Sequence, residues 1–378
     1  MKKRYSVGLI FILVFSLLVG CSGAGQNSDT IKIGWFGPLT GPTATDGIHS
    51  RDASQLAIDQ VNAQGGINGK KLELIAVDDQ GKPEEALKAV QKLINSDRVV
   101  SIIDGAYSGP SKTVAPKVQK AKVPMVAAYV VHPDVTKGGD YVNRVIYTGP
   151  VQGKAMADYA VNELKKKNIA VLYVDIDYGK SIYGSFKENA TQMGAKIAIE
   201  RSFKMGDKNF NSLLTAVKSA NPDALYIVGY YNESSAIVKQ AKEVGLNVQM
   251  LGVDGFDSPK YLELGKENTE GSIFTTSFYT SDEREVVQQF VKAWKEKHDT
   301  DPDMLSSQSY DAAKVIIEAL KKAGTDREKL AKAISETKDL EGTSGKITFG
   351  PNHEVIKPVI FMTVKDGKFQ YIKSKLYN

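Results

Sequence analysis

The chain has 378 residues, a formal net charge of +5 and a single cysteine. This length is sufficient for two domains of ordinary size. Three of the positive charges are Lys2, Lys3 and Arg4, and no acidic residue precedes Cys21, so the rest of the chain carries a net charge of +2, that is +5 minus 3. So balanced a charge excludes the concentrated basic surface that is typical of nucleic-acid binding.

The first 21 residues have the order of a bacterial signal peptide: a basic start, the almost wholly apolar run 7–19, and a small residue before Cys21. The ending Leu18-Val19-Gly20-Cys21 resembles the lipobox of bacterial lipoproteins, in which the cysteine is lipidated and becomes the first residue of the mature protein. The alternative is a transmembrane anchor, but the apolar run is shorter than the ~20 residues that a spanning helix needs. We therefore predict a signal peptide over residues 1–20, a lipidated linker over 21–30, and a protein anchored to the outer side of the cell membrane.

Strand and helix patterns alternate from residue 31 onwards. The predicted strands are 31–36, 72–77, 99–103 and 123–127, and the predicted helices are 48–64, 83–93 and 111–121. This βαβαβ order predicts a parallel sheet with helices on both faces.

The same series then occurs a second time. Its predicted helices are 151–164, 180–193, 210–219 and 234–244, and its strands are 169–174, 196–199, 224–228 and 250–253. Two similar halves predict two α/β lobes rather than one large sheet.

A helical block and three short strands complete the chain. The predicted helices are 282–297, 307–322 and one that starts at Thr325, which has capping-box spacing to Glu328. The predicted strands are 345–349, 355–364 and 369–372, with Asp366-Gly367 as a hairpin turn between the last two.

Several loop motifs together resemble a known family. They are Gly37-Pro38-Leu39-Thr40-Gly41-Pro42, the segment 57–69, Asp78-Asp79, Tyr107-Ser108-Gly109-Pro110-Ser111, Val123-Pro124, Asp177-Tyr178-Gly179 and Gly252-Val253-Asp254-Gly255. Their order and spacing resemble the type I periplasmic binding proteins of the branched-chain amino acid and amide class, which serve ABC importers. The resemblance covers roughly residues 31–377.

The resemblance implies an α/β fold of two Rossmann-like lobes joined by a three-segment hinge, with ligand trapped between them. Lobe I would comprise 31–148 and 278–345, and lobe II 149–277 and 346–378. The implied function is that of an extracytoplasmic solute-binding lipoprotein, a monomer without a cofactor, which delivers a small amino-acid-like ligand to an ABC permease. The alternatives are a ligand-sensing receptor subunit of the same fold, serving a chemoreceptor or a kinase, and a binder of an amide, amine or aromatic acid.

Ligands of open α/β sheets bind beyond the carboxyl ends of the strands, and the resemblance points to side chains in those loops. It implies that Ser108 binds a ligand carboxylate, that Asp254 meets the ligand ammonium, and that Tyr178 and Tyr230 wall the site, with Tyr231 as a possible substitute. The structural alternatives are a turn or N-cap serine, an aspartate that caps the next turn, and core tyrosines. Leu305 corresponds to an apolar wall position, and an ordinary surface or core leucine is the alternative.

Two positions depart from the family pattern. Where the family has Ala-Thr-Ser-Pro, this chain has Tyr129-Val130-Val131-His132-Pro133, so Val131 replaces a hydroxyl donor. The backbone near Tyr129 and Val130 can still contact a ligand, and His132 is either a donor or a solvated loop residue.

The second departure is Asp46, which replaces an aromatic residue of the family's amino-acid binders. Beside Asp254 it would place two negative charges in one cleft, which is unfavourable unless a cation joins them. The hypothesis that follows is a ligand with a positive or strongly donating group, with or without a carboxylate; the alternative is that Asp46 caps the helix 48–64.

No catalytic pattern is present in the sequence. The four histidines, His49, His132, His298 and His353, are scattered, and lipidation would use the only thiol. The glycine-rich stretch 65–69 ends a helix, whereas phosphate-binding loops open one. We therefore expect neither an enzyme nor a cofactor or metal site.

Overall fold

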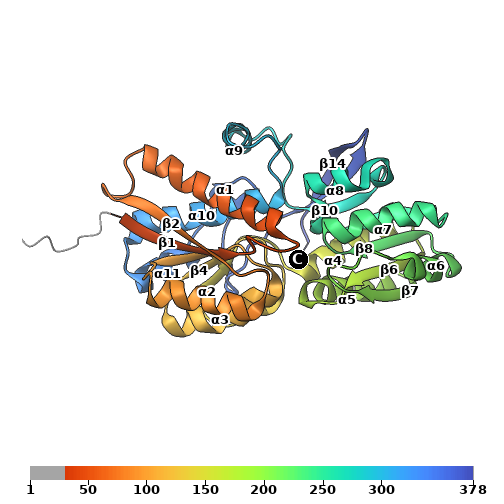
Figure 1. Ribbon diagram of the computed structural model, residues 1–378, viewed down its shortest axis with the longest axis horizontal. Coiled ribbons are helices and arrows are strands. Elements are labelled where there is room, and N and C mark those ends of the chain that lie inside the picture. The colour runs from red at the N-terminus through yellow and green to blue at the C-terminus, as the bar shows by residue number, and fades with distance from the viewer. Residues whose placement is uncertain (1–29, 378) are drawn as a thin grey trace, which may run out of the picture.

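The computed structural model describes residues 30–377, so the predicted signal peptide and Cys21 lie outside the described residues. Two α/β lobes lie side by side, each built on its own sheet (Figure 1). The first sheet has five strands in the order β2-β1-β3-β4-β5, and the second has seven in the order β14-β13-β10-β9-β8-β6-β7. The predicted fold class of two α/β lobes is confirmed.

The first sheet is parallel throughout. Its strands are β1 (Thr30–Gly37), β2 (Lys71–Asp78), β3 (Ser101–Asp104), β4 (Met125–Ala127) and β5 (Val142–Arg144), and its early helices are α1 (Ala44–Ala63), α2 (Pro83–Asn95) and α3 (Ser108–Ala121). Trp35 and Phe36 of β1 are both fully buried, on opposite faces of the strand. Apolar residues on both faces are expected where helices cover both sides of a parallel sheet.

The second sheet combines five parallel strands with an antiparallel edge. The parallel strands are β6 (Asn168–Val174), β7 (Lys196–Phe203), β8 (Ala224–Val228), β9 (Gln249–Gly252) and β10 (Ile273–Thr276), and the edge consists of β13 (Val359–Lys365) and β14 (Lys368–Lys375). The hairpin predicted at Asp366-Gly367 is confirmed, since both residues have positive φ and join β13 to β14. The helices of this part are α4 (Gly149–Asp158), extended by the π-turn η2 (Tyr159–Glu163), α5 (Asp177–Gln192), α6 (Asn211–Ser219), α7 (Tyr231–Glu243) and α8 (Pro259–Gly265).

The chain passes between the two sheets three times. It leaves the first sheet after β5, and it leaves the second after β10 for the helices α9 (Glu285–Lys295), α10 (Met304–Ala323) and α11 (Arg327–Ser335), of which α10 packs against α1 (Figure 1). After the short strands β11 (Leu340–Gly342) and β12 (Gly345–Ile347) it returns to the second sheet at β13. The lobe boundaries predicted near residues 148, 278 and 345 remain a proposal.

Arg144, at the end of β5, is fully buried and holds the third passage in place. Its guanidinium donates to the carbonyl oxygens of Val130 at 3.1 Å and His132 at 2.6 Å, and it pairs with Glu354. Its backbone N–H donates to the carbonyl of His353 at 2.9 Å. One side chain therefore connects the loop after β4 to the segment that returns to the second lobe.

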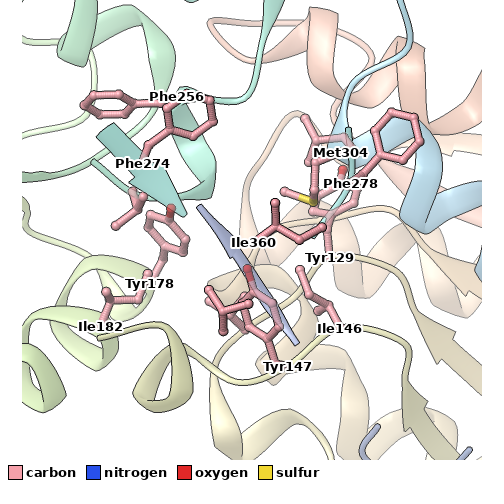
Figure 2. Packing of buried hydrophobic residues seen from close by; sticks show 14 of the residues in the cluster. Tyr129, Ile146, Tyr147, Tyr178, Ile182, Phe256, Phe274, Phe278, Met304 and Ile360 are labelled. Carbon is pink, nitrogen blue, oxygen red and sulfur yellow. The ribbon is translucent and has the colours of Figure 1, made fainter. Parts of the chain in front are cut away.

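The larger apolar core runs through the junction of the two lobes. Figure 2 shows Tyr178, Phe256 and Phe274 on one side and Tyr129 and Met304 on the other. Within residues 30–377, no helix has the length and hydropathy needed to cross a membrane.

Candidate functional site

A small cavity lies between the lobes, beyond the carboxyl ends of strands from both sheets. Its lining is Asp46, Tyr107, Ser108, Tyr129, Tyr178, Tyr230, Tyr231, Asp254, Gly255, Asp257, Ser258, Met304 and Leu305. The free volume of about 30 Å³ corresponds to about two water molecules. A ligand of amino-acid size therefore enters only if the lobes or the tyrosine rings move apart.

Asp46 lies in the first turn of α1 and is only 2% exposed. A Cβ at Gly47 would come within 1.8 Å of the carbonyl oxygen of Pro38, so only glycine allows this turn to approach the loop after β1. The Oδ2 atom of Asp46 accepts a hydrogen bond from the hydroxyl of Tyr107 at 2.5 Å, whereas Oδ1 is buried without a partner. Burial raises the pKa of Asp46 from 3.8 to about 7.

The alternative role of Asp46 as a helix cap is wrong. The helix α1 begins at Ala44, and its N-cap residue is Thr43. Asp46 is therefore already inside the helix, and its side chain is directed to Tyr107 and the cavity.

Asp254 occupies the corresponding place in the second lobe. It follows β9 in the short 3₁₀ turn Asp254–Phe256, and it accepts a hydrogen bond from the hydroxyl of Tyr178. Burial raises its pKa from 3.8 to about 6. Each lobe thus presents one buried carboxylate that is hydrogen-bonded to a tyrosine.

Tyrosine rings fill the space between these two carboxylates. The ring of Tyr230 lies 4.8 Å from that of Tyr107 and 4.8 Å from that of Tyr178, measured between ring centroids. The hydroxyl of Tyr230 is buried and has no partner. Tyr129 adds a further wall and donates its hydroxyl to the carbonyl of Gly105.

The cavity lining is acidic. Asp257 is its third carboxylate; burial raises its pKa to about 8, and it accepts a hydrogen bond from Thr276 at 2.5 Å. Among the described residues, no lysine, arginine or histidine lines the cavity. The imidazole of His49 lies behind Asp46 and is paired with Asp303 at 2.6 Å.

Ser108 is the first residue of α3, is 3% exposed, and lines the cavity. The free backbone N–H groups at the start of this helix favour an anion there. Ser108, Asp46, Tyr129, Tyr178, Tyr230 and Asp254, all predicted site residues, are thus brought together with Tyr231 and Leu305.

Val131 is placed differently. It is fully buried and is not among the residues that line the cavity, and its carbonyl accepts a hydrogen bond from the N–H of Gly149 at 2.7 Å. His132 also lies outside the lining, where its Nδ1 accepts from the N–H of Asp134 at 3.3 Å. The valine fills core space beside the chain passage from the first lobe.

The two lobes touch each other around the cavity. The ammonium of Lys112 on α3 lies 2.5 Å from the carboxylate of Asp177 on α5. The side-chain amide of Asn232 on α7 donates to the carbonyl of Pro42 at 3.1 Å. Each of these contacts joins an element of the first lobe to a helix of the second.

A family model described as "Periplasmic binding protein" matches residues 30–368. The chain belongs to the periplasmic binding protein family. The predicted resemblance to the type I proteins of this family is confirmed. Membership also places the protein outside the cytoplasm.

Relatives and solved structures match almost the full length. The chain is 28% identical to "Leu/Ile/Val-binding protein homolog 3" of Brucella melitensis over 93% of this chain and 95% of that protein. A leucine binding protein of Thermotoga maritima superposes with a TM-score of 0.86 at 33% identity, over 91% and 98% of the two chains. The branched-chain amino acid transporter substrate binding protein of Streptococcus pneumoniae, solved in complex with isoleucine, gives a TM-score of 0.86 at 29% identity, over 92% and 99%.

Within this periplasmic binding protein, the sequence analysis missed Tyr107, Asp257, Ser258 and Met304 as cavity residues. Tyr107 directly precedes Ser108 in a loop after a strand, so its position alone could have indicated the site. Met304 carries no such signal, because it reaches the cavity only through the packing of α10 against α1. No group of three or more potential metal ligands exists among the described residues.

Proposed function

We propose that the protein is the solute-binding component of an ABC importer and captures a small amino-acid-like ligand between its two lobes. The observation that carries the proposal is the cavity itself, whose lining comes from both lobes and from the carboxyl ends of both sheets. The ligands in the names of the relatives, leucine, isoleucine and valine, are consistent with this class.

The proposed roles of the residues follow from their chemistry. Ser108 and the start of α3 hold the ligand carboxylate, and Asp254 accepts a hydrogen bond from the ligand ammonium. Tyr178 and Tyr230 pack on the ligand, since a tyrosine combines an apolar face with a hydroxyl. Val131 contributes through the shape of its loop only.

Capture proceeds by hinge closure. In the open state the contact between Lys112 and Asp177 is broken, and the ligand binds to one lobe; closure then brings the second lobe onto it and expels water. The permease separates the lobes again when it takes the ligand. A micromolar dissociation constant corresponds to about −8 kcal/mol, which a few charge-assisted hydrogen bonds and aromatic packing can supply.

We also propose that residues 1–20 are a signal peptide and that the mature protein begins at a lipidated Cys21. The lipid would hold a monomeric binding protein close to its permease. The order of charge and hydropathy before Cys21 supports this proposal, and so does the small polar linker that follows Cys21.

The proposal is tested with the purified protein and a thermal-shift screen of amino acids, amides, polyamines and small aromatic acids. A ligand from the screen should then lower the radius of gyration in small-angle scattering, because closure compacts the molecule. The variant Asp254→Asn should bind it roughly 10- to 100-fold more weakly, since one charge-assisted hydrogen bond is lost. The matched control is Asp140→Asn, whose carboxylate is 88% exposed and lies outside the cavity. A bound ligand that leaves the radius of gyration unchanged would contradict the closure mechanism.

A further inference from the structure

The starting observation is a buried oxygen atom of Asp46 that has no hydrogen-bond partner in the cavity wall. The Oδ1 atom of Asp46 is buried and has no hydrogen-bond partner, while Oδ2 is bound by the hydroxyl of Tyr107. A buried carboxylate oxygen without a donor is unfavourable in a stable fold. Because Asp46 lines the cavity, the missing donor can be supplied by a ligand.

The second observation is the position of this carboxylate relative to Asp254. A continuous series of contacts connects them: Asp46 to Tyr107, Tyr107 to Tyr230, Tyr230 to Tyr178, and Tyr178 to Asp254. The two carboxylates therefore belong to different lobes, and the ring of Tyr230 contacts both of the tyrosines that bind them. Because each carboxylate is held by its own tyrosine on its own lobe, a ligand with a separate donor for each of them can satisfy both.

The third observation is the acidic charge of the cavity lining. Three aspartates line the cavity, and no basic side chain does so among the described residues. His49 is engaged with Asp303, and Lys112 with Asp177. The walls are otherwise five tyrosines, Tyr107, Tyr129, Tyr178, Tyr230 and Tyr231, whose ring faces attract cations.

We propose that the ligand carries a net positive charge, with one ammonium group at Asp254 and a second cationic nitrogen at Asp46. This inference rests on the proposed function and specifies its ligand class. A neutral aliphatic side chain would place methyl groups against the buried Asp46 carboxylate and leave its oxygen unsatisfied. A compact amino acid with a basic side chain, by contrast, satisfies both carboxylates and leaves its own carboxylate for Ser108.

The test uses pairs of amino acids that have the same shape and differ in charge. Ornithine and norleucine differ only in a terminal ammonium or methyl group, and 2,4-diaminobutyrate and norvaline form a shorter pair. Isothermal titration of each compound into the full mature protein should show at least 10-fold tighter binding of the cationic member of at least one pair. Asparagine serves as the neutral donor of similar size.

The variant Asp46→Asn keeps the shape of the side chain and removes its charge. It should weaken binding of the preferred cationic ligand roughly 10- to 100-fold and leave norvaline and norleucine within about 2-fold. The control Asp140→Asn makes the same chemical change at an exposed position outside the cavity and should leave every affinity within about 2-fold of the parent.

The possible results separate this inference from the proposed function. The inference is overturned, and the proposed function supported, if a neutral amino acid binds more tightly than the cationic compounds. The neutral compounds are norvaline, norleucine, leucine, isoleucine and asparagine. Equal losses of cationic and neutral ligands in Asp46→Asn also overturn the inference, because they indicate a purely structural role. If no member of the wider thermal-shift screen binds either, the proposed function fails together with the inference.

Discussion

The replacement of Asp46 by asparagine should also stabilise the ligand-free protein, and by an amount that depends on pH. In the folded protein Asp46 loses its proton near pH 7, because burial raises its pKa from 3.8 to about 7. In the unfolded chain it loses the proton near pH 4. Between these values the folded state binds a proton that the unfolded state has released, so this residue lowers the stability as the pH rises from 4 to 7.

The size of the effect follows from the displacement of the pKa. At roughly 1.4 kcal/mol per pH unit, a rise of about three units corresponds to ~4 kcal/mol. The asparagine amide accepts a weaker hydrogen bond from Tyr107 than the carboxylate does, which removes about 1 kcal/mol of this gain. We therefore expect Asp46→Asn to be more stable than the parent by ~3 kcal/mol at pH 8 and by close to zero at pH 4.5.

Urea-induced unfolding of the ligand-free protein, followed by circular dichroism at pH 4.5 and pH 8, measures this difference, and Asp140→Asn is the control. The substitution leaves the titratable groups that face Asp46 in place; they are His49, Tyr107, Tyr129, Tyr230, Tyr231, Glu233, Asp254 and Asp303. A gain that is the same at both pH values, or no gain at pH 8, would refute the reasoning, since the carboxylate would then carry no burial cost.

Three further predictions concern the cleft and the N-terminus. Lys112→Ala should weaken ligand binding by up to ~5-fold at low salt and have little effect at high salt. The substitution removes a half-exposed ion pair with Asp177 that only the closed state makes, and salt screens such a pair. Titration calorimetry at two salt concentrations measures the difference. Gly255→Ala should lower the free energy of unfolding by about 1–3 kcal/mol and the ligand affinity by more than 10-fold. The added Cβ would lie 2.2 Å from the carbonyl oxygen of Gly229 and push the two site loops apart. Urea unfolding measures the stability, and calorimetry measures the affinity. Cys21→Ala in the full-length protein should transfer it from the membrane fraction to the soluble fraction of the host cell, as seen by immunoblotting.

Each of these three variants has a matched control variant. Lys88→Ala removes an ion pair within α2, with Glu85, and should not change the affinity. Gly184→Ala introduces the same methyl group on α5 at a place with no atom within 4 Å, and should be tolerated. Ser22→Ala lies next to the lipidation position and should leave the protein in the membrane fraction. A salt-independent loss in Lys112→Ala, a fully active Gly255→Ala or a membrane-bound Cys21→Ala would contradict the corresponding argument.

Much of the fold could be predicted from sequence because central strands such as β3, β4 and β8 are buried on both faces and read as short apolar runs. The strands β5 and β10 were not predicted, because they have only three and four residues, although glycine turns at Gly139 and Gly271 precede them. Helix starts were also wrong: α1 and α3 begin four and three residues before the predicted starts, at 44 and 108 rather than 48 and 111. The residues before them, Thr43 and Tyr107, make no side-chain capping bond, so no local signal marks these ends.

The capping box predicted from Thr325 and Glu328 is wrong for a related reason. The side chain of the next residue, Asp326, caps α11 by accepting a hydrogen bond from the N–H of Lys329 at 2.9 Å. Two neighbouring residues can both provide a cap, and the sequence does not tell which is used.

Some residues of the site were also predictable from the sequence, and others were not. Ser108, Tyr178 and Asp254 directly follow strands and were predictable from position, because the carboxyl ends of parallel strands meet at one edge. Met304 was not, since it begins α10, 241 residues after the end of α1 (304 minus 63), and only the packing of α10 against α1 brings it there.

Arg144 sets a mechanical condition on the opening of the cleft. Because its guanidinium holds both the loop after β4 and Glu354, these two segments move as one body with the first lobe. The buried Lys357 is also tied to the first lobe, by Asp311 of α10 at 3.8 Å. We expect the third connection to bend only after Lys357, directly before β13. The pivot of this connection is therefore short and lies at a defined place, which limits how far the lobes can separate there.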